Sequence, residues 1–322
     1  MIVTEMELRD RIQVSPELFR LVSRIALFAV AVIIVTGAAV RLTGSGLGCP
    51  DWPKCYGQYI APGKTPAVIE YSNRVVTGLV SIATITAAIM GWFRRPYRRE
   101  LQILAILLPI GVMAQAILGA IVVGEELVWW TVSLHFVLSM LLMDAAFALA
   151  WCATYDPGDR PRAKDRLGVW SVRALLPIGV TTMTLGALTT AAGPHTGAGR
   201  TGETVHRLTI FGSDTLSNTV FGHGTAAVIF GLSVIATILV LRRPGGETRA
   251  LKPLFVVLGL LTTQGVIGLV QWQQELPSLL VWFHVLLVVL TWLAVLWSIG
   301  AAGLLEGEFE RSSREPAAQT EG

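Results

Sequence analysis

Apolar residues gather along this chain in long segments, and polar residues fill the short stretches between them. A helix needs about 20 residues to cross the roughly 30 Å of hydrocarbon in a bilayer, where backbone groups must be satisfied within the segment. The sequence lacks the short alternating strands of a membrane barrel. The pattern therefore predicts eight membrane-spanning helices, at residues 25–42, 75–92, 101–123, 128–152, 174–192, 219–241, 251–271 and 279–302.

The composition excludes the soluble alternatives. Hydrophobic residues make up 53% of the 322 residues and charged residues only 15%, and the mean hydropathy is +0.61. A soluble domain carries about 25% charge, so too few charged side chains are present to cover a globule of this size. A disordered chain and a disulfide-built secreted module are disfavoured for the same reason. The sequence predicts an all-α integral membrane protein.

Lysine and arginine are concentrated on alternate connections between the predicted spans. They cluster before the first span and on the links that follow spans two, four and six, whereas the links after spans three and seven have none. Cytoplasmic loops carry these residues in excess. Both termini are therefore expected in the cytoplasm, and the long loops after spans one and five are expected to face outward. We predict a multi-pass protein of a bacterial plasma membrane, with its functional sites toward the outer face.

The two halves of the sequence resemble each other. Gln115-Ala-Ile-Leu-Gly119 in span three matches Gln264-Gly-Val-Ile-Gly268 in span seven, and at equal distances after each glutamine lie a Glu-Leu pair and a histidine. Because four spans return the chain to its starting side, we predict two pseudo-symmetric, parallel four-helix bundles related by an axis along the membrane normal. The expected parts are a cytoplasmic N-terminal segment (1–24), an N-terminal bundle (25–152), a cytoplasmic linker (153–173), a C-terminal bundle (174–302) and a cytoplasmic tail (303–322).

Three of the five histidines, His135, His223 and His284, lie near the outer ends of even-numbered spans. An ionisable residue within a span indicates a functional site, although a lone histidine could simply bond across a helix interface. Helix bundles build cofactor sites from facing side chains, and two imidazoles suit the axial positions of heme iron. A histidine pair without nearby cysteines or carboxylates argues against zinc. We therefore predict that His223 and His284 ligate a heme.

The first half carries a different set of residues. Asn73, a poor iron ligand, occupies the position equivalent to the first histidine of the pair, so a heme on His135 would keep an open axial position, as oxygen chemistry requires. Glu70 shares a helical face with Asn73 and could transfer protons there; equally, it could cap the helix and pair with Arg74. Arg74 and Arg41 suit heme propionates, but snorkelling to the interface explains them as well.

Cys49 and Cys55 lie in the first outward loop, an oxidising environment that permits a disulfide. The loop they would close is short, so its entropic stabilisation is modest and a redox or shape-fixing role is favoured. Cys152, at the cytoplasmic end of span four, is expected to be an inert free thiol.

Several motifs resemble the heme A synthase family. Cys49-Pro-Asp-Trp-Pro53, with a second cysteine close behind, is similar to that family's first outer loop. Glu70-Tyr-Ser-Asn-Arg74 resembles its Glu-x-x-His-Arg motif, with Asn73 in place of the commoner histidine, and Gly193-Pro-His-Thr-Gly197 resembles its Gly-Pro-His-Ala-Gly loop. The histidines of spans four, six and eight match as well, so the resemblance covers residues 25–302.

The resemblance implies oxidation of the C8 methyl of heme O to the formyl group of heme A by successive hydroxylations, in a pathway that serves terminal oxidases. It implies a heme b on His223 and His284, and the substrate heme O at His135, with Glu70 needed for activity. The partners it implies are an electron donor (a quinol or a ferredoxin-like protein), heme O synthase, cytochrome oxidase assembly factors and membrane lipid, and no nucleic acid. His195 matches the family's outer-loop histidine, although a loop-fixing hydrogen bond would also explain it, whereas His206 matches nothing.

Other functions are compatible with parts of the pattern. A membrane b-type cytochrome that exchanges electrons with quinone would explain the paired histidines but not Glu70 or the cysteine loop. A transporter built from parallel repeats would show helices interrupted near the midplane. A heme carrier without catalysis is a further alternative.

Overall fold

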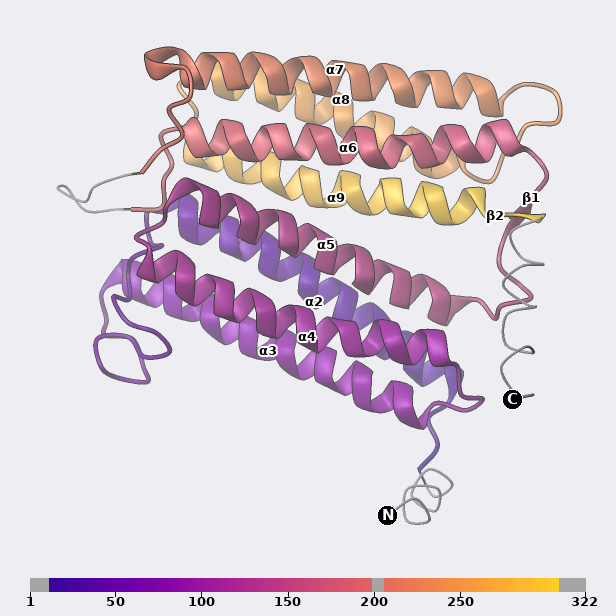
Figure 1. Ribbon diagram of the computed structural model, residues 1–322, viewed down its shortest axis with the longest axis horizontal. Coiled ribbons are helices and arrows are strands. Elements are labelled where there is room, and N and C mark those ends of the chain that lie inside the picture. Colours follow the sequence, from indigo (N-terminus) through magenta and orange to yellow (C-terminus); the bar gives the residue numbers. More distant parts are fainter. Residues whose placement is uncertain (1–11, 199–205, 307–322) are drawn as a thin grey trace, which may run out of the picture.

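The computed structural model describes residues 12–198 and 206–306. Within these residues, eight helices are long and apolar enough to cross a membrane (Figure 1). The helices are α2 (Pro16–Leu42), α3 (Thr65–Phe93), α4 (Arg99–Gly124), α5 (Trp129–Thr154), α6 (Arg166–Ala192), α7 (Thr215–Leu241), α8 (Leu251–Gln273) and α9 (Ser278–Ala302). The chain is a multi-pass membrane protein, as its hydrophobic pattern predicted.

Several helices begin well before the apolar segments that predicted them. Helix α2 starts at Pro16 rather than at residue 25, because Ser15 accepts a hydrogen bond from the backbone N–H of Leu18 and proline suits the first turn. Helix α3 starts ten residues before the predicted span, again with a proline in its first turn. The sequence rule finds only the apolar part of a helix, and these first turns are polar.

The longer helices change where the candidate residues lie. Glu70, Asn73 and Arg74 are all inside α3 rather than ahead of it. His223 was expected to open its span, but α7 starts at Thr215 and the histidine lies about two turns inside the helix. These four candidate residues therefore lie within helices and not on the connecting loops.

Each half of the chain packs its helices in a closed ring. Helix α3 packs against α2 and α4, and α5 completes the first ring by packing against α4 and α2. In the second half, α7 packs against α6 and α8, and α9 packs against α8 and α6. The two groups lie one above the other in Figure 1 and meet through α2 with α9, α5 with α6 and α5 with α9. Consequently α3 and α5 face each other diagonally across one ring, and α7 and α9 across the other.

Apolar side chains point both into these rings and away from them. Phe19, Leu108 and Met143 are fully buried between helices, whereas Phe28 is 71% and Phe221 77% exposed. In lipid, exposed apolar surface is in its preferred solvent, so close packing and hydrogen bonds between helices hold the assembly together. One such bond joins the two halves directly, from Trp292 Nε1 on α9 to Asp144 Oδ1 on α5 at 2.5 Å.

The two ends of the helices differ. One end, here called the long-loop end, carries the α2–α3 and α6–α7 connections, the second of which includes the short 3-10 helix η1 (Gly212–Asp214). The other, here called the basic end, carries the arginine-rich connections 94–98, 155–165 and 242–250. Helix α2 begins and α9 ends at the basic end (Figure 1). Residues 1–11 of the predicted N-terminal segment and residues 307–322 of the predicted tail lie outside the described residues.

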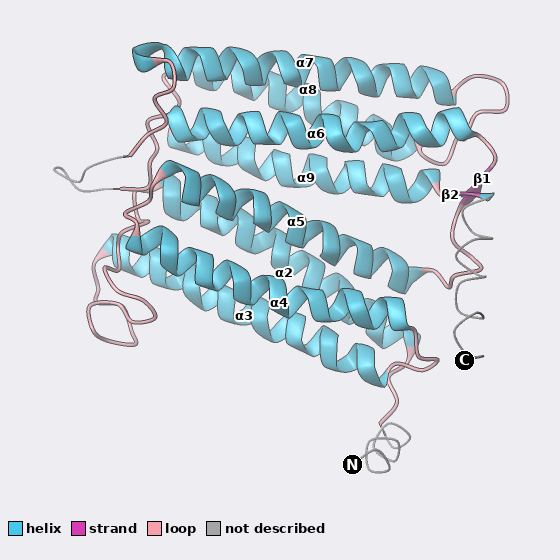
Figure 2. Cartoon of the chain, viewed as in Figure 1, coloured by secondary structure: helices cyan, strands magenta, loops and turns pink. Residues whose placement is uncertain are grey.

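The connections at the basic end are tied together. Figure 2 shows two short strands there, β1 (Arg162–Ala163) and β2 (Leu304–Leu305), which pair in parallel. The α5–α6 and α7–α8 connections meet at the buried carboxylate of Asp165, which accepts hydrogen bonds from the backbone N–H groups of Gly168 and Glu247 and pairs with Arg243.

These contacts set the ionisation of Asp165. Burial acts to raise the pKa of its carboxyl, but the two backbone N–H groups and the Arg243 guanidinium outweigh burial, so the pKa is lowered. A carboxyl whose pKa is lowered in the folded state stabilises that state above its unfolded pKa of about 3.9, and the stabilisation is lost as pH falls through the folded value.

We predict that Asp165→Ala destabilises the detergent-solubilised protein by about 1–3 kcal/mol at pH 7, because it leaves partly buried donors unpaired. Thermal unfolding measures the loss, which should shrink as the pH falls below about 4. The exposed Asp159 on the same connection provides the control, since Asp159→Ala should leave unfolding unchanged. Equal unfolding temperatures for the two variants would contradict the role given to Asp165.

Candidate functional site

The two histidines of the second half approach each other across its helix ring. His223 on α7 and His284 on α9 have ring centres 6.2 Å apart, with their planes at 73°. The two helices are diagonal in the ring, so the imidazoles project into its interior from opposite sides. The sequence predicted this pair, and the structure brings the two side chains together.

A hydrogen bond of His223 determines which of its two ring nitrogens is free to bind a metal. Its Nδ1 lies 3.0 Å from the backbone oxygen of Thr182 on α6. A carbonyl oxygen only accepts, so Nδ1 donates and Nε2 carries the free lone pair, which is the usual arrangement for a metal-bound histidine. Gly186 lies directly beside this ring: a Cβ there would come within 3.0 Å of Cε1. Glycine at this position leaves the space that the imidazole occupies.

The separation of the rings fits a shared iron. Metal–imidazole bonds are about 2.0–2.1 Å long, and the ring centre lies about 1 Å beyond the bonded nitrogen, so two axial imidazoles have centres about 6 Å apart. The Nδ1 atom of His284 is buried and has no hydrogen-bond partner among the described residues. Both the spacing and the nitrogen donor set suit the axial positions of a heme.

The first half places one histidine in the equivalent position. His135 on α5 packs beside Gly119 of α4, as His284 packs beside Gly268 of α8; in both pairs a glycine Cβ would lie 3.7 Å from the histidine Cε1. The Nδ1 atom of His135 is also buried without a partner in the described part of the chain. Asn73, on the diagonal helix α3, instead accepts a hydrogen bond at Oδ1 from Thr36 Oγ1 of α2, at 2.8 Å.

Glu70 and Arg74 hold the cysteine loop against the head of α3. The buried carboxylate of Glu70 accepts from the backbone N–H of Cys49 at 2.8 Å and from the Arg74 guanidinium at 2.5 Å. Arg74 also donates to the backbone oxygens of Asp51 and Lys54, at 3.0 and 2.8 Å. The pairing of Glu70 with Arg74, which the sequence left as one of two roles, is therefore present, together with a loop contact that the sequence did not predict.

The predicted disulfide between Cys49 and Cys55 is present, and both residues are fully buried. Cys152 is a free, half-buried thiol, as expected.

Arg41 and His195 link the two halves at the long-loop end. The Arg41 guanidinium donates to the backbone oxygens of His195 and Thr190, at 2.8 and 2.9 Å. His195 in turn bonds through Nε2 to the backbone oxygen of Leu276 at 2.6 Å. The structure thus gives His195 a loop-fixing contact, and it places Arg41 between the halves. A loop-fixing hydrogen bond of His195 was one of the roles left open by the sequence, but the partners of His195 and Arg41 could not be predicted, because both contacts join distant segments.

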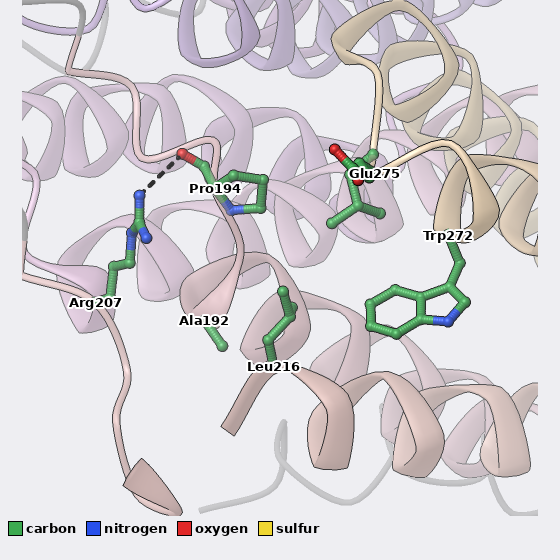
Figure 3. A pocket seen from close by; sticks show the side chains of 7 residues that line it. Ala192, Pro194, Arg207, Leu216, Trp272 and Glu275 are labelled. Carbon is green, nitrogen blue, oxygen red and sulfur yellow. Dashed lines mark hydrogen bonds between the residues drawn. The ribbon is translucent and has the colours of Figure 1, made fainter. Parts of the chain in front are cut away.

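A pocket of about 460 Å³ opens at the long-loop end of the second half, between the end of α6, the start of α7 and the end of α8 (Figure 3). Its lining includes Trp272, Glu275 and Arg207, and the Arg207 guanidinium donates to the backbone oxygen of Pro194 at 3.4 Å. The pocket lies about two helical turns from His223, counted along α7 from Leu216. The sequence did not indicate these residues, because a lone tryptophan or arginine at a span end is common in membrane proteins.

The matching Glu-Leu pairs of the two halves form the same turn. Glu126, Leu127, Glu275 and Leu276 all have left-handed backbone conformations, with φ between 52° and 62°. In each turn the leucine N–H donates to the carbonyl five residues earlier. The sequence similarity between the halves therefore extends to backbone geometry at the turns before α5 and α9.

Fold and site together define a multi-pass membrane protein with a pair of facing histidines inside one of its helix rings. Residues 20–295 match the family model of the COX15-CtaA cytochrome oxidase assembly proteins. The chain therefore belongs to this family.

The chain is also similar to curated bacterial proteins. It is 35% identical over 133 residues to the heme A synthase of Bacillus pumilus (strain SAFR-032), an alignment that covers 41% of this chain and 43% of that protein. It is 36% identical over 124 residues to the heme A synthase of Lysinibacillus sphaericus (strain C3-41), covering 37% and 39% of the two chains. The aligned segments span less than half the length of these relatives.

The contacts of Glu70 predict a structural effect that is separable from any chemistry. Glu70→Ala leaves the Cys49 N–H and the Arg74 guanidinium without their buried acceptor, so the loop should open more often and a water-soluble phosphine should reduce the disulfide about tenfold faster. Thiol labelling followed by mass spectrometry measures the rate. Glu125→Ala, at an exposed glutamate of the α4–α5 turn, is the matched control. Unchanged reduction in Glu70→Ala would show that this carboxylate does not hold the loop.

Proposed function

We propose that this protein oxidises the C8 methyl of heme O to the formyl group of heme A, as a heme A synthase. The observation that carries the proposal is the pair His223 and His284, whose ring separation of 6.2 Å and free His223 Nε2 suit one heme iron. Family membership and the curated relatives support the same conclusion.

We assign a resident heme b to His223 and His284 and the substrate heme O to His135. Such hemes would supply one-electron redox chemistry and, where an axial position is open, oxygen activation. The side chain of Asn73 supports an open position, because its oxygen is already engaged by Thr36. In this proposal His135 holds the substrate heme from one side only, and Asn73 leaves the opposite side without a strong ligand.

Glu70 is the carboxylate we assign to proton transfer. Glu70 lies near the start of α3, about one turn before Asn73. Helix α3 is diagonal in the ring to α5, which carries His135. Hydroxylation by oxygen consumes protons, and a carboxyl group placed beside the reacting centre can deliver them. Arg74 and the Cys49 N–H orient the carboxylate, and the disulfide loop shields it from water.

In this proposal Arg41 and Arg74 have a different role from Arg207. Arg41 and Arg74 direct their guanidinium groups to backbone carbonyls, which favours a role in holding the loops over the heme propionate contacts that the sequence suggested. Arg207, at the pocket above His223, is the cation we place nearest the propionates of the resident heme.

We further propose that the two helix rings are pseudo-symmetric parallel bundles, with domain limits at 25–152 and 174–302. The equivalent packing order and the matching turns support this arrangement. The arginine-rich connections favour a cytoplasmic basic end, so both termini would be cytoplasmic and the heme sites would lie toward the outer face. The proposed partners are a quinol or ferredoxin-like electron donor, heme O synthase and cytochrome oxidase assembly factors.

The ligand assignment predicts the spectrum of the resident heme. His284→Ala should lose the b-type absorption of the purified protein, because one axial bond is removed. His206→Ala is the matched control, since this exposed histidine lies outside the proposed site and its replacement should leave the spectrum intact. A full b-type spectrum in His284→Ala would contradict the assignment.

The role of Glu70 predicts a change in product. Glu70→Gln keeps an acceptor for the Cys49 N–H but cannot carry protons as a carboxylate does, so we expect heme binding to persist while heme A falls about a hundredfold or more. Heme O or a hydroxylated intermediate should accumulate, and mass analysis of extracted pigments identifies it. Normal heme A in this variant would remove Glu70 from the chemistry.

A further inference from the structure

Trp282 on α9 reaches from the second half of the protein into the first. Its indole Nε1 donates to the backbone oxygen of Val35 on α2, at 3.2 Å. Trp282 lies two residues before His284 on the same helix, so one end of this contact is close to the candidate ligand of the resident heme.

The other end of the contact is close to the candidate substrate site. The carbonyl of Val35 belongs to the peptide bond that leads directly to Thr36, and Thr36 Oγ1 donates to Asn73 Oδ1 at 2.8 Å. A continuous path of covalent and hydrogen bonds therefore runs from His284 through Trp282, Val35 and Thr36 to Asn73.

The repeat does not account for this tryptophan. The equivalent position in the first half, which lies as far before His135, is Ser133. Its hydroxyl bonds to the backbone oxygen of Trp129 on its own helix, at 2.7 Å. At this position of the repeat the cross-half contact is thus made by α9 and not by α5, on the face of α9 that packs against α2.

We infer that Trp282 is a positioning residue that links the two heme sites and carries the route for electrons between them. This inference rests on the proposed function. One electron leaves the ferrous iron of the resident heme, which becomes ferric, and reduces the ferric iron of the substrate heme. No bond is made or broken, and an external donor of the quinol class restores the electron. The indole supplies both a fixed distance between the helices and a bonded path across the interface.

The test is interheme electron transfer in the full-length protein loaded with both hemes, followed by rapid-mixing spectroscopy after reduction of the resident heme. Trp282→Phe keeps an aromatic ring but removes the N–H donor. Because electron transfer slows when the bonded path is broken and when the distance between the two hemes increases, we expect the transfer rate to fall severalfold. Trp130→Phe, at a half-exposed tryptophan on α5, is the control and should transfer at the wild-type rate.

Two further measurements keep the test decisive. Heme content and the absorption spectrum show whether Trp282→Phe still binds both hemes, and pulsed EPR of the two ferric irons detects any change in their separation. If that variant loses heme, Thr36→Val breaks the same path from the other half, and it too should slow transfer. Wild-type rates in Trp282→Phe or in heme-replete Thr36→Val would overturn the inference.

Failure of the inference can be told apart from failure of the proposed function. Electron transfer between the hemes is measured without forming product, whereas the proposed function requires heme A. Wild-type protein that makes heme A, with variants that transfer electrons at the normal rate, would contradict only the role of Trp282. Wild-type protein that makes no heme A would contradict the proposed function and, with it, the purpose given to the link.

Discussion

The packing of four helices into a closed ring is the constraint on which the candidate site depends. Neighbouring helices fill the ring, and the diagonal pair α7 and α9 is left facing across its interior. Lipid offers no hydrogen bonds, so an imidazole in this region must find partners inside the protein. The carbonyl of Thr182 supplies one for His223, and Gly186 leaves space for the ring beside it. The resulting separation of 6.2 Å between the imidazoles follows from that packing.

The same ring carries different side chains in the two halves. In the second half the diagonal helices carry two histidines, whereas in the first they carry His135 and Asn73. Two strong axial ligands suit electron transfer, and one suits chemistry at the iron. Contacts between the halves, through Arg41 and Trp282, then hold the two candidate sites in a fixed relation.

Much of this arrangement could be predicted from the sequence. Long apolar segments identified the helices, and the matching depths of the histidines in even-numbered spans identified the histidine pair, because both signals depend on local composition and spacing. The first turns of α2 and α3 were missed, since they are polar and depend on caps and prolines that an apolar window ignores. The contacts of Arg41 and His195 could not be predicted, because each joins segments that only the packed structure brings together. The disulfide could be predicted from the position of its two cysteines. The hydrogen bond from the Cys49 N–H to Glu70 could not be predicted.

We propose that the two helix rings together convert heme O to heme A. The most direct measurement supplies the purified wild-type protein in liposomes with heme O, oxygen and a one-electron donor, and then determines the masses of the extracted pigments. We expect a product whose mass corresponds to replacement of a methyl by a formyl group. Recovery of only unchanged heme O and heme b, from protein that binds both, would contradict it.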